Sequence, residues 1–201
     1  MLWILRAKFV AGHNPWFDSQ MKGSHCIDPH QVSFLGIDFQ TRLLPAIHNS
    51  ACVCRQASAL IEAAELLSIP TVLTAHCPDK LGGVTDQIMA PDAKVVHKQT
   101  FDATASIPKA IISPAKQVVV FGCETHVCVL QTVAGLLRSG DRNVFVVSDA
   151  CGTRTLENHV QALQRMRDWG VSIVTTEMVL FEAVQRPEHP EFRAVLSLIK
   201  Q

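Results

Sequence analysis

The stretch that decides the fold reads Val118-Val119-Val120-Phe121-Gly122-Cys123-Glu124-Thr125-His126-Val127-Cys128. Residues 117–121 have the length and β-branched content of a fully buried parallel strand, and residues 127–137 form an apolar helical run. Cys128 therefore lies in the first turn of a helix that follows a strand, where unpaired amides and the helix dipole stabilise a thiolate. We expect the pKa of Cys128 to be lower than the ~8.5 of a free thiol.

Strand and helix patterns alternate along the rest of the chain. Strand-like runs cover residues 33–38, 71–75, 94–97, 143–148 and 172–175, and helical patterns cover 51–67, 125–138, 156–169 and two segments near the C-terminus. This alternation predicts an α/β fold, with a doubly wound, mostly parallel sheet between two layers of helices. Residues 1–32 lack steady periodicity, so we predict an irregular N-terminal extension followed by one domain over residues 33–201.

The composition narrows the classes of function. The 201 residues are 48% hydrophobic and carry 18 basic and 18 acidic side chains. Without a basic run, this balance argues against a nucleic-acid partner and favours a small-molecule substrate. The apolar excess indicates oligomerisation.

Cysteine usage and hydropathy indicate a compartment. The seven cysteines are an odd number without framework spacing, which fits a reducing environment. No apolar run reaches the ~18–20 residues of a membrane span, so we expect a cytoplasmic protein without a membrane partner. Residues 1–22 carry three basic side chains and one acid, which leaves mitochondrial targeting open as an alternative.

Chemically competent side chains follow several predicted strands. Functional residues of a doubly wound sheet lie at the carboxyl ends of its strands, and Asp38, His76, Lys98 and Cys128 stand there. Each also has an ordinary interpretation: a surface lysine, a small core cysteine, or an aspartate that caps or joins a network. His126 is a poor base for Cys128, because residues two apart on a helix do not face each other.

The sequence contains no recognisable metal or cofactor motif. Cys52 and Cys54 point to different sides of a predicted helix, and the adjacent pair His76 and Cys77 lacks the spacing of a zinc site. The pair of glycines at residues 82–83 is too short for a phosphate-binding loop. We therefore expect no metal and no cofactor.

Three separated segments carry a family resemblance. They read Ile37-Asp38-Phe39-Gln40, His97-Lys98-Gln99-Thr100-Phe101 and Gly122-Cys123-Glu124-Thr125-His126-Val127-Cys128-Val129-Leu130-Gln131-Thr132. In this order they resemble the isochorismatase-like cysteine hydrolases, and the subgroup of isochorismatase domain-containing proteins in particular. The resemblance covers roughly residues 33–200, and it implies a Rossmann-like topology for the sheet and a homo-oligomer, a dimer or larger.

The resemblance implies a catalytic triad. Cys128 would be the nucleophile, Asp38 the base that takes its proton, and Lys98 the cation that orients the acid. A cis peptide bond would join Cys123 to Glu124, and the amides of Glu124 and Cys128 would bind an oxyanion. The implied reaction is the hydrolysis of a small amide, or a related C–N or ester bond, through a thioester. Candidates for the substrate pocket are Gln40, His76, Phe101 and Thr125.

Two departures and two alternatives accompany this hypothesis. Nicotinamidases of the family hold a metal with an aspartate and two histidines after the second strand, where this chain reads Ala75-His76-Cys77-Pro78-Asp79. Isochorismate-cleaving members of the family do not rely on the nucleophilic cysteine, so the presence of Cys128 argues against isochorismate as the substrate. The first alternative is a binding or scaffolding protein with little turnover. The second is a redox sensor in which Cys123 or Cys151 resolves a sulfenate on Cys128.

Overall fold

Six parallel strands form a single sheet. The computed structural model describes residues 25–88, 93–108, 115–140 and 142–200. The strands pair in the order β3-β2-β1-β4-β5-β6, all parallel to their neighbours. This is the doubly wound order of Rossmann-type sheets, so the predicted fold class is confirmed. The bounds are β1 Val32–Ile37, β2 Thr71–His76, β3 Lys94–Lys98, β4 Gln117–Cys123, β5 Asn143–Gly152 and β6 Ser172–Val174.

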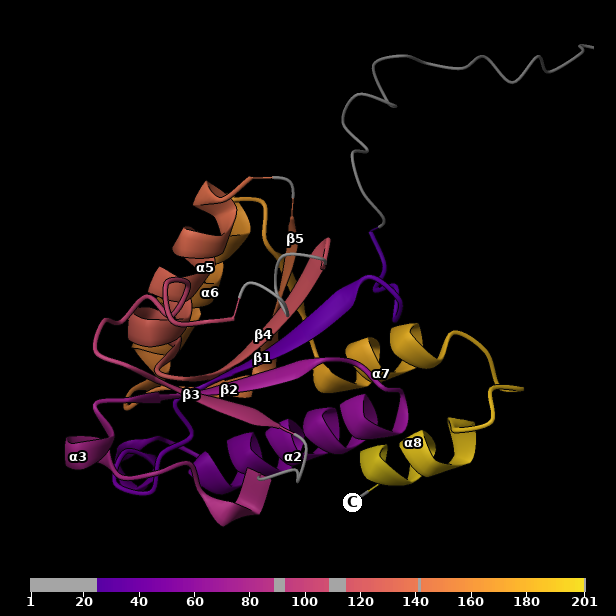
Figure 1. The fold of residues 1–201 in the computed structure, drawn as a ribbon, viewed down its shortest axis with the longest axis horizontal. Helices are drawn as coiled ribbons and strands as arrows, with labels where there is room; N and C mark the ends of the chain where they lie inside the picture. Colours follow the sequence, from indigo (N-terminus) through magenta and orange to yellow (C-terminus); the bar gives the residue numbers. More distant parts are fainter. Residues whose placement is uncertain (1–24, 89–92, 109–114, 141, 201) are drawn as a thin grey trace, which may run out of the picture.

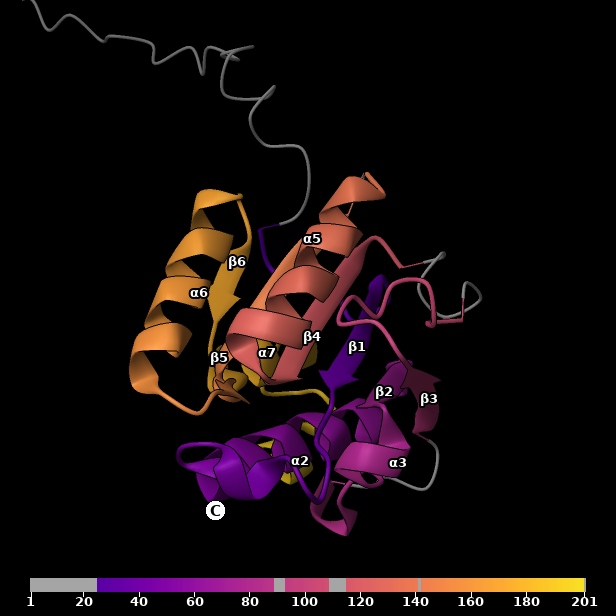
Figure 2. The same ribbon diagram turned by 90° about the vertical axis from the view of Figure 1, so that its left-hand side faces the viewer.

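Helices cover both faces of the sheet. Figure 1 shows α5 and α6 on one face and α2, α7 and α8 on the other, and Figure 2 shows α5 and α6 running side by side. Short turns connect the longer elements. The bounds are η1 Leu44–Ala46, α2 Ser50–Leu66, α3 Pro78–Leu81, η2 Asp86–Ile88, η3 Thr125–Val129, α5 Leu130–Arg138, α6 Leu156–Asp168, α7 Thr176–Val184 and α8 Phe192–Ile199.

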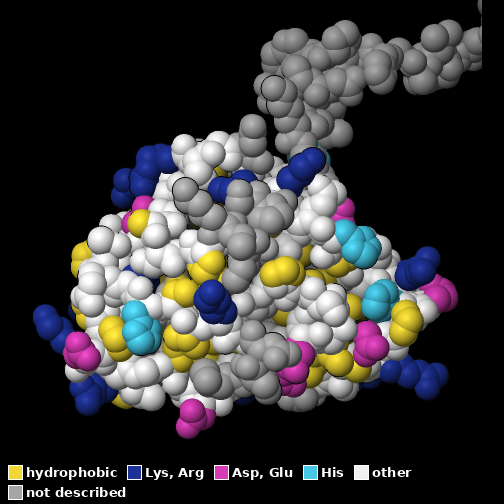
Figure 3. Space-filling model, in the orientation of Figure 1, with side chains coloured by type: hydrophobic (Ala, Val, Ile, Leu, Met, Phe, Trp, Pro, Cys, Tyr) yellow, Lys and Arg dark blue, Asp and Glu magenta, His cyan; other side chains and the backbone are white. Residues whose placement is uncertain are grey.

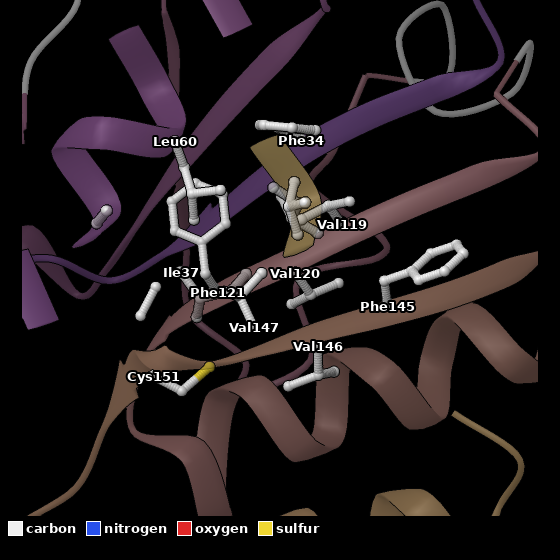
Figure 4. Close-up of a cluster of buried hydrophobic side chains, with 14 of the residues drawn as sticks. Phe34, Ile37, Leu60, Val119, Val120, Phe121, Phe145, Val146, Val147 and Cys151 are labelled. Atoms are coloured by element: carbon white, nitrogen blue, oxygen red, sulfur yellow. The ribbon is translucent and has the colours of Figure 1, made fainter. Parts of the chain in front are cut away.

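The central strands β1 and β4 are buried along their whole length. They lie in the middle of the sheet with helices on both faces, so neither strand has a solvent face that polar residues could occupy. Phe34 of β1 and Phe121 of β4 make an edge-to-face contact with ring centroids 6.4 Å apart, and Leu60 of α2 belongs to the same cluster (Figure 4). This packing explains the continuous apolar run that opened the sequence analysis.

The segment after β4 differs from the predicted continuous helix. Residues 125–129 form a π-helical turn, in which the amide of Val129 reaches back to the carbonyl of Glu124. The regular α-helix begins only at Leu130. An apolar helical pattern does not distinguish a π turn from an α turn, and such turns are frequent at functional sites.

The end of the predicted N-terminal extension packs against the domain. Ile27 is buried, and its amide donates to Oε2 of Glu182 at 2.8 Å. The amide of Asp28 donates to Oε1 of Gln117 at 2.7 Å. The hypothesis of a targeting signal in residues 1–22 lies outside the described residues. Within the described ranges, none of the helices combines the length and apolarity that crossing a membrane requires.

Gly122, which precedes the site, has a backbone that only glycine adopts easily. Its φ is +135°, and an added Cβ would lie 2.1 Å from the carbonyl oxygen of Ile37. We predict that Gly122→Ala lowers the free energy of unfolding by about 2–5 kcal/mol. Chemical denaturation measures this change. The matched control is Gly83→Ala, where an added Cβ meets nothing within 4 Å, and equal losses in the two variants would contradict the argument.

Candidate active site

Three neighbouring strands bring an acid and a lysine together. Asp38 directly follows β1, and Lys98 is the last residue of β3, with β2 between them. His76, the last residue of β2, is in register with Lys98. Because parallel strands end at the same edge, side chains far apart in sequence meet there. Asp38 adopts a left-handed backbone, with φ of +52°.

Asp38 and Lys98 form a buried ion pair. Nζ of Lys98 lies 2.6 Å from Oδ2 of Asp38, and both side chains are at most 1% exposed. The hydroxyl of Thr74 donates to Oδ1 of Asp38 at 2.7 Å, and Nζ of Lys98 also donates to the carbonyl of Thr100 at 3.3 Å. Both carboxylate oxygens therefore accept a hydrogen bond, which is how a buried charge is stabilised in a protein interior.

Cys128 lies beside this pair on the π-helical turn. The Asp38 carboxylate and the Lys98 ammonium both interact with its thiol. Burial is the largest cause that raises the pKa of Cys128, the charge of Asp38 adds to the rise and Lys98 partly offsets it, so that the pKa lies at about 12. The expected lowering of this pKa was therefore wrong. The helix-terminus argument omits burial and the neighbouring carboxylate, and both favour the neutral thiol.

A cavity of about 340 Å³ opens onto the acid and the cysteine. Its walls are largely apolar, and its polar side chains are two carboxylates that belong to ion pairs and three residues at and just after the end of β2. A volume of this size suits a small molecule rather than a polymer chain. The lining residues are Asp38, Leu43, His76, Cys77, Lys80, Leu81, Phe101, Glu124, Val127 and Cys128.

One wall of the cavity combines a histidine, an aromatic ring and a second thiol. The rings of His76 and Phe101 have centroids 5.2 Å apart. Cys77 follows His76 with its Sγ 3.5 Å from Nε2 of that residue, and it donates to Oε1 of Gln99 at 3.1 Å. Burial lowers the pKa of His76, and Lys98 lowers it further. His76 is therefore neutral near pH 7.

The turn between β4 and Cys128 carries a second ion pair. The peptide bond between Cys123 and Glu124 is cis, as the resemblance implied. The carboxylate of Glu124 lies at the cavity and accepts from Nε of Arg154 at 2.8 Å. Cys123 is fully buried, and that burial raises the pKa of its thiol.

The structure does not bring all the pocket candidates to the cavity. Gln40 is fully buried, and its side-chain amide is bonded to the backbone of His76 and Gly82. The hydroxyl of Thr125 faces the carbonyl of Gly152 and Nδ1 of His159. These two side chains form hydrogen bonds with the backbone around the site, whereas His76 and Phe101 line the cavity. Cys123, Cys151 and His126 do not line the cavity either, and Cys77 is the second thiol there.

Some site residues were missed by the sequence analysis. Thr74, Cys77 and Arg154 contact predicted site residues, but only Cys77 stands next to one in the sequence. Thr74 had one usable signal, because residues two apart in a strand share a face and His76 was already a candidate. Arg154 had none, since its contact depends on how the loop after β5 folds. Among the described residues, no group of three His, Cys, Asp or Glu side chains is placed to hold a metal ion.

Comparisons with known proteins place the chain in a family. A model described as the isochorismatase domain matches residues 33–178, more than half of the chain. The chain belongs to the isochorismatase-domain family. Among the relatives of this isochorismatase-domain chain is isochorismatase domain-containing protein 1 of Danio rerio, 33% identical over 87% of this chain and 62% of that protein. The resemblance seen in the sequence, including the subgroup, is confirmed.

Two further comparisons carry different descriptions. The secreted isochorismatase effector Isc1 of Phytophthora sojae is 35% identical over 85% of this chain and 81% of that protein. A solved structure of a MAR1 ribonuclease from Caenorhabditis elegans superposes with a TM-score of 0.83 at 30% identity, covering 88% of this chain and 93% of that one. The isochorismatase-domain chain thus has the fold of this hydrolase family, and it spans less than two thirds of the zebrafish relative's length.

Proposed function

We propose that this isochorismatase-domain protein is a cysteine hydrolase of a small amide, or of a related C–N or ester bond. The observation that supports this most is the buried pair of Asp38 and Lys98 beside Cys128 at one cavity. A nucleophile, a base within reach of it and a cation that orients the base are the parts that nucleophilic catalysis requires. Its place in the cytoplasm and its assembly as a homo-oligomer stay predictions.

The proposed reaction begins with a neutral thiol. Asp38 takes the proton from Sγ of Cys128 as the sulfur attacks the carbonyl carbon, because the raised pKa leaves little thiolate beforehand. The amides of Glu124 and Cys128 bind the oxyanion. The C–N bond breaks as Asp38 returns the proton to the leaving amine, and a thioester remains on Cys128. Water then attacks the thioester and gives a proton to Asp38, which passes it to the departing sulfur.

The cavity favours a substrate whose acyl group is apolar and carries no positive charge. Leu43, Leu81, Phe101 and Val127 line it, and His76 is neutral near pH 7. The two carboxylates at the cavity already have cationic partners, Lys98 and Arg154. A positive charge on the acyl group would lose its hydration in such a pocket without gaining a partner, whereas the ammonium of Lys80 at the same cavity could pair with a negative charge.

A panel of simple amides and esters tests the proposal. We predict that Cys128→Ala lowers kcat by about 10⁴- to 10⁶-fold on any member that the wild type hydrolyses. Trapping of an acyl group on Cys128, read by mass spectrometry, supports the thioester. The matched control is Cys77→Ala, which removes the other thiol of the cavity and keeps turnover within a few-fold. Undiminished turnover by Cys128→Ala would overturn the nucleophile assignment.

Other outcomes of the same panel favour the alternatives. No turnover together with tight binding of a partner protein that Asp38→Ala leaves unchanged would indicate the binding or scaffolding role. An RNA substrate belongs in the panel because of the worm protein's description. Against an RNA substrate, basic and acidic side chains are interspersed on the face drawn in Figure 3, and formal net charge is +0.

A further inference from the structure

We propose that Thr74 is a positioning residue that fixes the orientation of Asp38 for proton transfer. The inference rests on the proposed function, in which Asp38 takes a proton from Cys128 and later returns it. Thr74 lies on β2, between the strands that carry Asp38 and Lys98. It has no place in the triad that the family resemblance implied.

Thr74 makes three contacts with Asp38, through its hydroxyl and its carbonyl oxygen. Its hydroxyl donates to Oδ1 at 2.7 Å, the same hydroxyl oxygen lies 3.3 Å from the Asp38 amide, and the Thr74 carbonyl accepts from that amide at 3.2 Å. One side chain therefore holds both the backbone and the carboxylate of the acid. Asp38 has a left-handed backbone, a conformation that aspartate adopts more readily than most residues, and the contacts with Thr74 hold the amide and the carboxylate in it.

The two partners of Asp38 divide its carboxylate between them. Lys98 holds Oδ2 and Thr74 holds Oδ1, so rotation of the carboxylate about χ2 breaks both hydrogen bonds. A proton-transfer group has to be held close to its productive direction, and two bonds on opposite oxygens do this. Lys98 alone would leave the carboxylate free to turn about one contact.

Packing does not explain a hydroxyl at position 74. Thr74 is fully buried, and its neighbours along β2 are Val72, Leu73 and Ala75, which are buried as well. Valine has nearly the same shape as threonine, and a buried hydroxyl without a partner is costly. The hydroxyl therefore acts through its bond to Asp38. Thr74 does not line the cavity, so it cannot act by touching substrate.

Two substitutions test the proposal. Thr74→Val removes the hydroxyl and keeps the shape, and Thr74→Ser keeps the hydroxyl and removes a methyl group. We predict that Thr74→Val lowers kcat by about 10- to 100-fold, the range for a hydrogen bond to a charged group, with KM changed less than about twofold because the cavity walls are intact. Thr74→Ser restores kcat to within about threefold of the wild type.

Three results would overturn the proposal: an unchanged kcat in Thr74→Val, equal losses in both variants, or a loss that appears in KM. Crystal structures of the two variants supply a readout that needs no substrate. The Asp38 carboxylate is expected to turn in Thr74→Val and to keep its orientation in Thr74→Ser. If the wild type hydrolyses nothing, the proposed function fails, and an unmoved carboxylate in Thr74→Val would separately overturn the positioning role.

Discussion

Replacing Lys98 by methionine is expected to lower the free energy of unfolding by about 3–5 kcal/mol and to abolish turnover. Methionine has a similar length and fills the space, so the loss does not come from a cavity. It comes from Asp38, which is left buried with its charge and without the cation 2.6 Å away. Urea denaturation monitored by circular dichroism measures the change.

An exposed pair on the same protein provides the matched control. Arg138 and Asp102 are 2.8 Å apart, but the arginine side chain is 69% exposed. Arg138→Met is expected to cost no more than about 1 kcal/mol, because water solvates the carboxylate that remains. Similar losses in the two variants would show that burial does not govern the Lys98 pair.

The double variant separates stability from chemistry. Asp38→Asn combined with Lys98→Met removes both charges, so the unfolding free energy is expected to recover most of the loss seen in Lys98→Met alone. Turnover stays absent, because neither the base nor its cation is present. A double variant less stable than Lys98→Met would contradict the account of an uncompensated carboxylate.

The sequence predicted which residues stand at the strand ends, but not the hydrogen bonds and ion pairs that hold these residues in place. The apolar runs fixed the strands, and Asp38 and Lys98 then fell at one edge because all parallel strands end there. The contacts of Thr74 and Arg154 depend on side-chain directions in the folded chain, which spacing does not specify. Gln40 and Thr125 are the opposite case. Each belongs to a recognisable motif, but its side chain forms hydrogen bonds with buried backbone and does not line the cavity.

The pKa of Cys128 could not be predicted from its local sequence. Its position after a strand was evident from the sequence, and a helix terminus alone would lower its pKa. The folded protein adds burial and the Asp38 charge, and together these raise the pKa to about 12. For the proposed reaction, this means that a neutral thiol near pH 7 requires a base during the attack and not before it.

Asp38→Asn is therefore expected to move two measurements in opposite directions. Turnover falls by about 10²- to 10⁴-fold, the usual contribution of a general acid–base group. Alkylation of Cys128 by iodoacetamide becomes faster between pH 8 and 10, because the charge of Asp38 raises the pKa of this thiol and the substitution removes that charge while Lys98 stays. The thiolate fraction grows about tenfold for each unit by which the pKa falls.

The wild type sets the baseline for this test, and the exposed Cys26 and Cys52 are internal references. Their alkylation, followed by peptide mass spectrometry in the same samples, should not respond to Asp38→Asn. In the wild type, the rate at Cys128 should still be rising at pH 10, since its pKa of about 12 keeps the thiol protonated there. Slower alkylation of Cys128 in Asp38→Asn would mean that the carboxylate already holds the thiol's proton in the resting protein. A base that acts only during attack requires the opposite result, because in the resting protein its charge opposes ionisation of the cysteine that it serves.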